Sequence, residues 1–100
     1  MSSIVLFELW HGVQRSPEHP ENAERLNLLL AGGVDVVPFE REDSLAAGAL
    51  RANLESLGTP IGPYDLLIAA QGLRTGATIV TANTREFARV PDLSWEDWST

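Results

Sequence analysis

A rigid loop that runs directly into a buried helix constrains this chain more than any other feature. The stretch from Thr59 to Ala70 reads T-P-I-G-P-Y-D-L-L-I-A-A. Pro63 suits a first helical turn, where its missing N–H costs nothing, and the apolar run behind it predicts a helix buried on most sides. Asp65 falls in that first turn, where a carboxylate suits the helix dipole. One carboxylate therefore stands at the mouth of a buried helix, which fits a metal-binding acid and equally an ordinary first-turn aspartate.

The composition favours one small globular domain. The chain has 100 residues, of which 44% are hydrophobic, and it lacks the apolar run of about 18 residues that a membrane span needs. A net charge of −7 argues against a passive nucleic-acid binder, but it permits a nuclease whose acids are neutralised by divalent metal. Because the sequence has no cysteine and no leader-like start, we expect no thiolate metal site and a cytoplasmic location.

Hydrophobic spacing and helix breakers predict an α/β chain with a parallel sheet, forming a single domain over residues 1–100. Ser2 and Ser3 offer an N-terminal cap for the first helix. A parallel sheet needs more strands than the sequence supplies, so we expect part of the fold to lie before Met1. The predicted helices are Ile4–Gln14, Glu21–Ala31, Glu42–Leu57 and Pro63 to about Thr75; the predicted strands are Val34–Phe39 and Thr78–Thr81, followed by a turn R-E-F-A-R and an extended tail, Val90–Trp98.

Three segments in register resemble a PIN-domain ribonuclease toxin of the VapC type. They read S-S-I-V-L-F-E-L-W-H-G-V, T-P-I-G-P-Y-D-L-L-I-A-A and T-I-V-T-A-N-T-R-E-F-A-R-V-P-D-L, and the match runs from Ser2 to Trp98. The resemblance implies a three-layer α/β/α fold with a parallel sheet. It also implies a Mg²⁺- or Mn²⁺-dependent ribonuclease that is the toxin half of a bacterial toxin–antitoxin pair. RNA, an antitoxin protein and a second copy of the chain are therefore the expected partners.

The resemblance implies an acidic metal site built from separate segments. The glutamate of the family's early helix corresponds to Glu8, and the aspartate of the proline-bracketed loop corresponds to Asp65. These two carry the expected catalytic role, and a third ligand at the end of the late strand corresponds to Asn83. Asn83 is also a natural helix cap before Thr84. Glu86, three residues further on, fits either a ligand or the turn itself, and we favour the turn.

Arginines and histidines supply weaker signals. Arg85 and Arg89, four apart on the late turn, fit a grip on RNA phosphates, and they fit pairing with Glu86 or Asp92 equally well. His11 lies on the first helix, where packing is a more frequent role than acid–base chemistry. Two histidines without matching ligand spacing do not predict a zinc site.

One departure from the family pattern stands out. The first aspartate of the family's site lies on an opening strand, and this sequence contains no such segment. We therefore expect an N-terminally truncated fold, lacking the first strand and most of the second, with weak or no cleavage by the chain as written. The alternative is a non-catalytic PIN remnant that binds antitoxin or dimerises through the apolar surfaces of Ile4–Val13 and Glu21–Ala31.

Overall fold

Five helices and two strands follow one another in residues 1–81 and 84–97, the part of the chain that the computed structural model describes. The chain divides into an N-terminal unit, Met1–Phe39, and a C-terminal unit, Glu40–Thr100. None of the described helices has the length and apolar character that crossing a membrane requires. In chain order the elements are α1 (Ser3–Arg15), α2 (His19–Ala31), α3 (Arg41–Ser56), α4 (Pro63–Thr75), β1 (Ile79–Thr81), α5 (Thr84–Phe87) and β2 (Trp95–Asp97).

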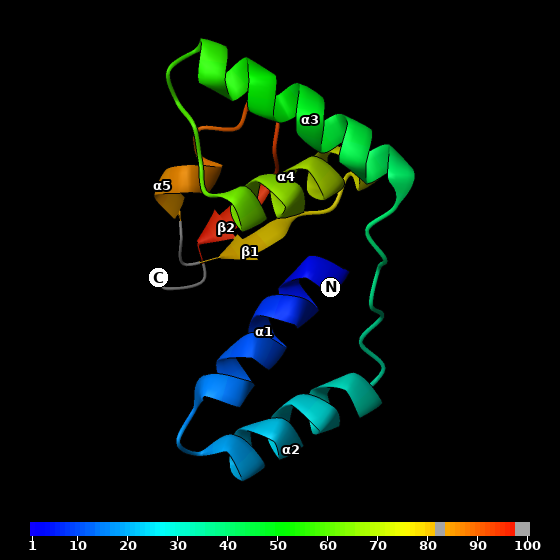
Figure 1. Cartoon of the computed structure of the whole chain (residues 1–100). Helices are drawn as coiled ribbons and strands as arrows, with labels where there is room; N and C mark the ends of the chain where they lie inside the picture. The colour runs from blue at the N-terminus through cyan, green and yellow to red at the C-terminus, as the bar shows by residue number, and fades with distance from the viewer. Residues whose placement is uncertain (82–83, 98–100) are drawn as a thin grey trace. The chain divides into compact units, whose positions relative to one another are not determined.

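In the N-terminal unit, α1 and α2 form an antiparallel helical hairpin (Figure 1). Ser2 caps α1, because its side-chain oxygen accepts a hydrogen bond of 3.1 Å from the Ile4 amide. Val13 of α1 and Leu26 of α2 are buried, at 8% and 7% exposure. Both predicted helices are therefore confirmed, with boundaries that differ by one or two residues at their ends.

The predicted strand over residues 34–39 is wrong. Within this segment only Val37 pairs, in a single parallel bridge with Ser2, and the Ser3 amide donates to the Val37 carbonyl at 2.9 Å. Among the described residues Ser2 forms the bridge to this segment, and α1 begins at the next residue, Ser3. Pro38 also has no N–H to donate to a ladder. The apolar run at residues 34–39 is therefore an extended connection to α3 rather than a strand.

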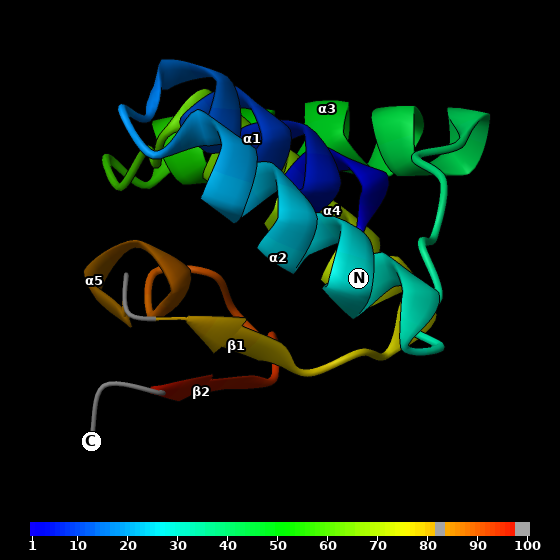
Figure 2. The ribbon, with the colours of Figure 1, turned by 90° about the horizontal axis from the view of Figure 1, so that it is seen from below.

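In the C-terminal unit, α4 lies between α3 and the two strands (Figures 1 and 2). Its backbone packs closely on β1, since a Cβ added at Gly72 would lie 3.0 Å from Ile79 Cδ1 and 3.3 Å from Leu93 Cδ1. The predicted burial of this helix is confirmed. At most 7% of the surface is exposed at Leu66, Ile68, Ala69 and Ala70.

The strands β1 and β2 pair in parallel and lie side by side in Figure 2. Their register runs from Ile79 opposite Trp95 to Thr81 opposite Asp97. The predicted short strand and its parallel pairing are confirmed, but the partner is the C-terminal tail, which the sequence predicted only as extended. Over the described residues the sheet has two strands. The larger parallel sheet of a three-layer α/β/α fold therefore stays a prediction.

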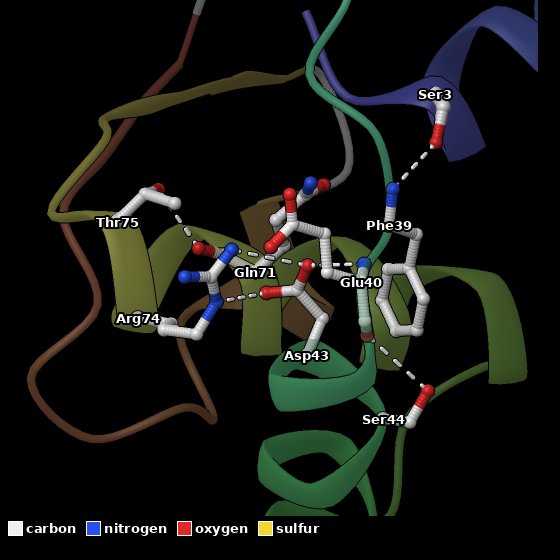
Figure 3. Close-up of polar contacts among 8 residues, drawn as sticks. All are labelled: Ser3, Phe39, Glu40, Asp43, Ser44, Gln71, Arg74 and Thr75. Carbon is white, nitrogen blue, oxygen red and sulfur yellow. Dashed lines mark hydrogen bonds and ion pairs between the residues drawn. The ribbon is translucent and has the colours of Figure 1, made fainter.

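An ion pair between the buried Asp43 and the partly exposed Arg74 joins the start of α3 to the end of α4 (Figure 3). Asp43 has no exposed surface. Its carboxylate accepts hydrogen bonds from Arg74 Nε and, at 3.2 Å, from Arg74 Nη2, as well as one of 2.7 Å from the Glu40 amide. The hydrogen bond from Arg74 holds the pKa of the Asp43 carboxyl below its usual range, against the opposing effect of burial.

Candidate metal and RNA site

Asp65 stands in the first turn of α4, where the sequence predicted it. Gly62 is the N-cap residue and Pro63 follows it as the first residue of the helix. The Leu66 amide donates to the Gly62 carbonyl at 2.9 Å, which starts the helical hydrogen bonds. Leu66 is buried and Asp65 is half-buried. The apolar face of α4 thus packs into the core, and Asp65 lies at the edge of that buried face.

The carboxylate of Glu86 comes to the same place from α5. The Gly62 amide donates a hydrogen bond of 3.2 Å to Glu86 Oε2. A Cβ added at Gly62 would lie 3.3 Å from Glu86 Oε2 and 3.8 Å from Asp65 Oδ2. Two half-buried carboxylates, from helices far apart in sequence, therefore converge beside the one residue of the loop that has no side chain. We call Asp65 and Glu86 the acid pair.

Two buried side chains anchor α5 and the turn after it in the core of the C-terminal unit. Phe87 and Val90 are 2% and 4% exposed, so the turn that carries them is anchored in the core. Glu86 and Arg89 lie three residues apart, which brings their side chains to neighbouring positions on a helical turn. Arg89 Nη1 donates a hydrogen bond of 2.7 Å to the Pro60 carbonyl. Two side chains from α5 and the turn after it therefore hydrogen-bond to the loop in front of α4. Glu86 accepts from that loop, and Arg89 donates to it.

The donor chemistry of the acid pair fits a hard divalent cation. Carboxylate oxygens are the ligands that Mg²⁺ and Mn²⁺ prefer, and Mg²⁺ is commonly held by one or two protein carboxylates together with waters and substrate oxygens. Within either unit, over residues 1–81 and 84–97, no three His, Asp or Glu side chains gather into a metal-binding group. Of the acid pair, Asp65 belongs to the ligand set that the family resemblance implies, whereas the sequence analysis favoured the turn for Glu86.

The other predicted site residues fall in different places. Glu8 belongs to the N-terminal unit and is exposed on α1, so its sharing of a cation with Asp65 stays a prediction. Asn83 lies outside the described residues, and both its ligand role and its cap role stay predictions. Arg85 is exposed on α5. Arg89 contacts the loop backbone, which differs from both of the roles that the sequence suggested for it.

The two histidines of the N-terminal unit lie against aromatic rings. His11 stacks on Phe7 with a centroid distance of 6.4 Å and an interplanar angle of 8°. His19 meets Trp10 edge-on, also at 6.4 Å. The contact with Phe7 agrees with the packing interpretation of His11.

Sequence reasoning gave too little weight to Glu86 and Gly62. It assigned Glu86 to the turn and Gly62 only to the stiffness of the loop, because nothing local shows that residues 24 positions apart hydrogen-bond to each other. One signal was available. Glu86 directly precedes the apolar Phe87 and stands three residues from Arg89, so an anchored turn would present both charges together.

Comparison with known proteins identifies the family. Residues 1–93 match the PIN domain. Ribonuclease VapC2 of Rickettsia felis is 40% identical over 98 residues, which cover 98% of this chain and 72% of that protein. The tRNA(fMet)-specific endonuclease VapC of Salmonella typhimurium is 37% identical over 102 residues, which cover 98% of this chain and 74% of that protein.

The fold agrees with these sequence matches. The crystal structure of VapBC2 from Rickettsia felis, bound to a DNA fragment from its promoter, gives a TM-score of 0.89 at 40% identity. The superposition covers 97% of this chain and 72% of that one. Both the sequence and the arrangement of the elements thus lead to one conclusion: the chain belongs to the PIN-domain family and, within it, to the VapC ribonucleases.

Proposed function

We propose that this chain is a metal-dependent endoribonuclease, the toxin half of a toxin–antitoxin pair, which hydrolyses RNA phosphodiester bonds with Mg²⁺ or Mn²⁺. One observation carries the proposal. The carboxylates of Asp65 and Glu86 both reach within 4 Å of the position that a methyl group on Gly62 would occupy. RNA as the substrate is supported by the names of two relatives at 40% and 37% identity, a ribonuclease and a tRNA-specific endonuclease.

The acid pair would hold the cation from the C-terminal unit, and Glu8 and Asn83 are proposed as further oxygen ligands. When bound, the cation stabilises the negative charge that develops on the phosphate. The contribution of the chain is to fix the carboxylates before the substrate arrives. Glu86 is oriented by the Gly62 amide at 3.2 Å, and Asp65 is oriented by the buried helix that begins two residues before it. Such preorganisation avoids reorganising charged groups during the reaction.

Arg85 contacts the RNA backbone. It is exposed and precedes Glu86 directly on α5. A guanidinium matches a phosphate through forked hydrogen bonds. On a chain of net charge −7, such a local cation also offsets the repulsion that a phosphate would otherwise meet. The name of the Salmonella typhimurium relative makes tRNA the first substrate to test.

The test combines metal binding with RNA cleavage by the full 100-residue chain. We expect Mn²⁺ binding, followed by calorimetry or by the electron paramagnetic resonance signal of free Mn²⁺, to weaken at least tenfold in Asp65→Asn and in Glu86→Gln. Cleavage of a tRNA mixture by this chain is expected to be weak, to need Mg²⁺ or Mn²⁺ and to be lost in Asp65→Asn.

A charge-matched control is Glu55→Gln. Glu55 forms only an exposed ion pair with Arg51, at 3.7 Å, and such pairs contribute little to stability. This variant is expected to bind Mn²⁺ as the wild type does. Cleavage that persists in EDTA, or Mn²⁺ binding that does not depend on Asp65, would contradict the proposal.

The antitoxin is proposed to cover the apolar groove of the N-terminal unit. This groove, of about 430 Å³, lies between α1 and α2. Phe7 and Trp10 line it, although 49% and 43% of their surfaces are exposed. Apolar patches that stay exposed on a small protein often mark protein interfaces. The similar solved structure, VapBC2 of Rickettsia felis, supports a protein partner for this chain.

Two further expectations belong to this proposal. A second copy of the chain is expected to form a homodimer, which sedimentation of the purified protein would detect. The cytoplasm remains the expected site of action, since RNA substrates are present there and the sequence has no cysteine.

A further inference from the structure

The loop in front of α4 has few backbone groups that can hold it in place. Residues 60–62, which we call the 60–62 loop, are preceded by Thr59 and followed by Pro63. Proline has no N–H, so within the loop only Ile61 and Gly62 have an amide to donate. The Gly62 amide donates to Glu86, and the Gly62 carbonyl accepts from the Leu66 amide at 2.9 Å. The orientation of the loop therefore depends strongly on a small number of contacts.

One of these contacts is a side chain from the turn that follows α5. Arg89 Nη1 donates to the Pro60 carbonyl at 2.7 Å, over a separation of 29 residues. Together with the bond between Glu86 and Gly62, it joins the two ends of the 60–62 loop to α5 and the turn after it. The two bonds have opposite polarity, since Glu86 accepts at Gly62 and Arg89 donates at Pro60. A shift of the loop along α5 would therefore break both.

We propose that Arg89 is a positioning residue for the acid pair and not a contact to RNA. Its guanidinium holds the Pro60 carbonyl, and so it keeps the Gly62 amide on Glu86 and the Glu86 carboxylate beside Asp65. This inference rests on the proposed function for its catalytic consequence, but the contact itself exists without RNA or metal. Arg85, four residues earlier on α5, provides the matched contrast, because both arginines are exposed and carry the same charge.

The two roles predict different results. A phosphate contact adds to the salt dependence of RNA binding, by a slope of about 0.7 per contact with single-stranded RNA. A positioning residue leaves that slope unchanged. It affects instead the metal affinity and the rate of the bound complex, because small displacements of reacting groups can lower a rate by about a hundredfold.

The experiment compares Arg89→Met, Arg89→Lys and Arg85→Met in the full chain. The first readout is the hydrogen-exchange rate of the Gly62 amide by nuclear magnetic resonance, without metal or RNA. We expect exchange at least tenfold faster in Arg89→Met, closer to the wild-type rate in Arg89→Lys, which keeps a donor, and unchanged in Arg85→Met. Exchange of the buried α4 amides, such as that of Ala69, reports whether each variant is folded.

The second readout uses Mn²⁺ and a fluorescent oligoribonucleotide. Arg89→Met is expected to weaken Mn²⁺ binding about tenfold and to lower kcat, with KM and the salt slope of RNA binding in EDTA unchanged. Arg85→Met is expected to raise KM and to reduce the salt slope by about 0.7, with Mn²⁺ binding unchanged.

Two results would overturn the inference. One is wild-type exchange at Gly62 in Arg89→Met, and the other is a reduced salt slope in that variant with normal Mn²⁺ affinity. If Arg89→Met does not fold, Arg89→Ala decides in its place, because it also removes the donor to Pro60, and wild-type exchange at Gly62 in that variant would overturn the inference. If the wild-type chain cleaves no RNA, the proposed function fails, whereas the exchange rate of the Gly62 amide still tests the positioning role.

Discussion

The carboxylate of Asp43, which has no exposed surface, accepts two hydrogen bonds from the guanidinium of Arg74, 31 residues further along the chain. Asp43 stands in the first turn of α3 and Arg74 in the last turn of α4. Their pairing therefore joins the opposite ends of the two helices that pack together in the C-terminal unit (Figure 3). The same carboxylate accepts from the Glu40 amide at 2.7 Å, which secures the start of α3.

Arg74→Met is expected to destabilise the protein strongly. It leaves the Asp43 carboxylate, which has no exposed surface, without its cation, and a buried charge that loses its partner is strongly destabilising. A domain of this size is stabilised by about 5–15 kcal/mol in total, so the urea midpoint should fall clearly. The double variant Asp43→Asn/Arg74→Met removes the charge but keeps an acceptor for the Glu40 amide, and it should recover much of the loss. A double variant as unstable as the single one would contradict this account.

The ion pair between Asp43 and Arg74 is expected to make the protein less stable in acid. The hydrogen bond from Arg74 lowers the pKa of the Asp43 carboxyl in the folded state. The pair therefore contributes fully above the unfolded pKa, about 3.9, and its contribution disappears as the pH falls through the folded pKa. Urea unfolding should show the free energy of unfolding falling below about pH 4. The Asp43→Asn/Arg74→Met variant should show a shallower fall, and an equal fall in both proteins would exclude Asp43 as the source.

Local sequence signals predicted the helices well. Each of the four long helices has an identifiable start or stop, such as the Ser2 cap of α1, Pro63 at the start of α4 and Gly76 at its end. Gly76 adopts a φ of 72°, a left-handed conformation that glycine reaches without strain. Such signals depend on residues a few positions apart, so the sequence is enough to find them.

Strand pairing was harder to predict, because it depends on partners distant in sequence. Residues 34–39 have the composition of a strand, but in the described part of the chain they pair through one bridge, from Val37 to Ser2, and α1 begins at Ser3. The partner of β1 is the tail at Trp95–Asp97, whose short polar pattern gave no strand signal. The acid pair was hard to predict for the same reason, because its two residues are distant in sequence. Asp65 is recognisable as a candidate from its own loop, whereas Glu86 becomes a candidate only through the fold that brings it to Gly62.

Gly62→Ala is expected to disturb the acid pair and leave the fold intact. The backbone of Gly62 has a φ of −60°, which alanine adopts without strain. The added Cβ would lie 3.3 Å from Glu86 Oε2, so the carboxylate must move by a few tenths of an ångström. We expect Mn²⁺ binding to weaken severalfold, measured by calorimetry, with a urea midpoint close to that of the wild type.

The control for this variant is Gly48→Ala. Nothing lies within 4 Å of a Cβ added at Gly48, in the middle of α3. Alanine there should raise the free energy of unfolding by up to about 1 kcal/mol, because glycine weakens a helix interior by that amount. Mn²⁺ binding should be unchanged. If Gly62→Ala bound Mn²⁺ as tightly as Gly48→Ala does, the acid pair would not be the metal site.

Trp10→Glu is expected to abolish tight binding of the antitoxin proposed to be encoded beside this chain. Trp10 lines the groove between α1 and α2, and 43% of its surface is exposed. Buried aromatic anchors at protein interfaces commonly contribute about 2 kcal/mol or more, which corresponds to roughly thirtyfold in affinity. A carboxylate in the groove would also lose hydration without gaining a partner. Isothermal titration of the purified chain with the antitoxin measures the change.

The matched control for Trp10→Glu is Leu45→Glu on α3, where an apolar side chain is 67% exposed outside the groove. It should bind the antitoxin as the wild type does, because it introduces the same charge on an open surface. Sedimentation of both variants separates the two possible occupants of the groove. If Trp10→Glu dissociated a homodimer but bound the antitoxin normally, the groove would be the contact between copies of the chain, and the antitoxin would have to dock elsewhere.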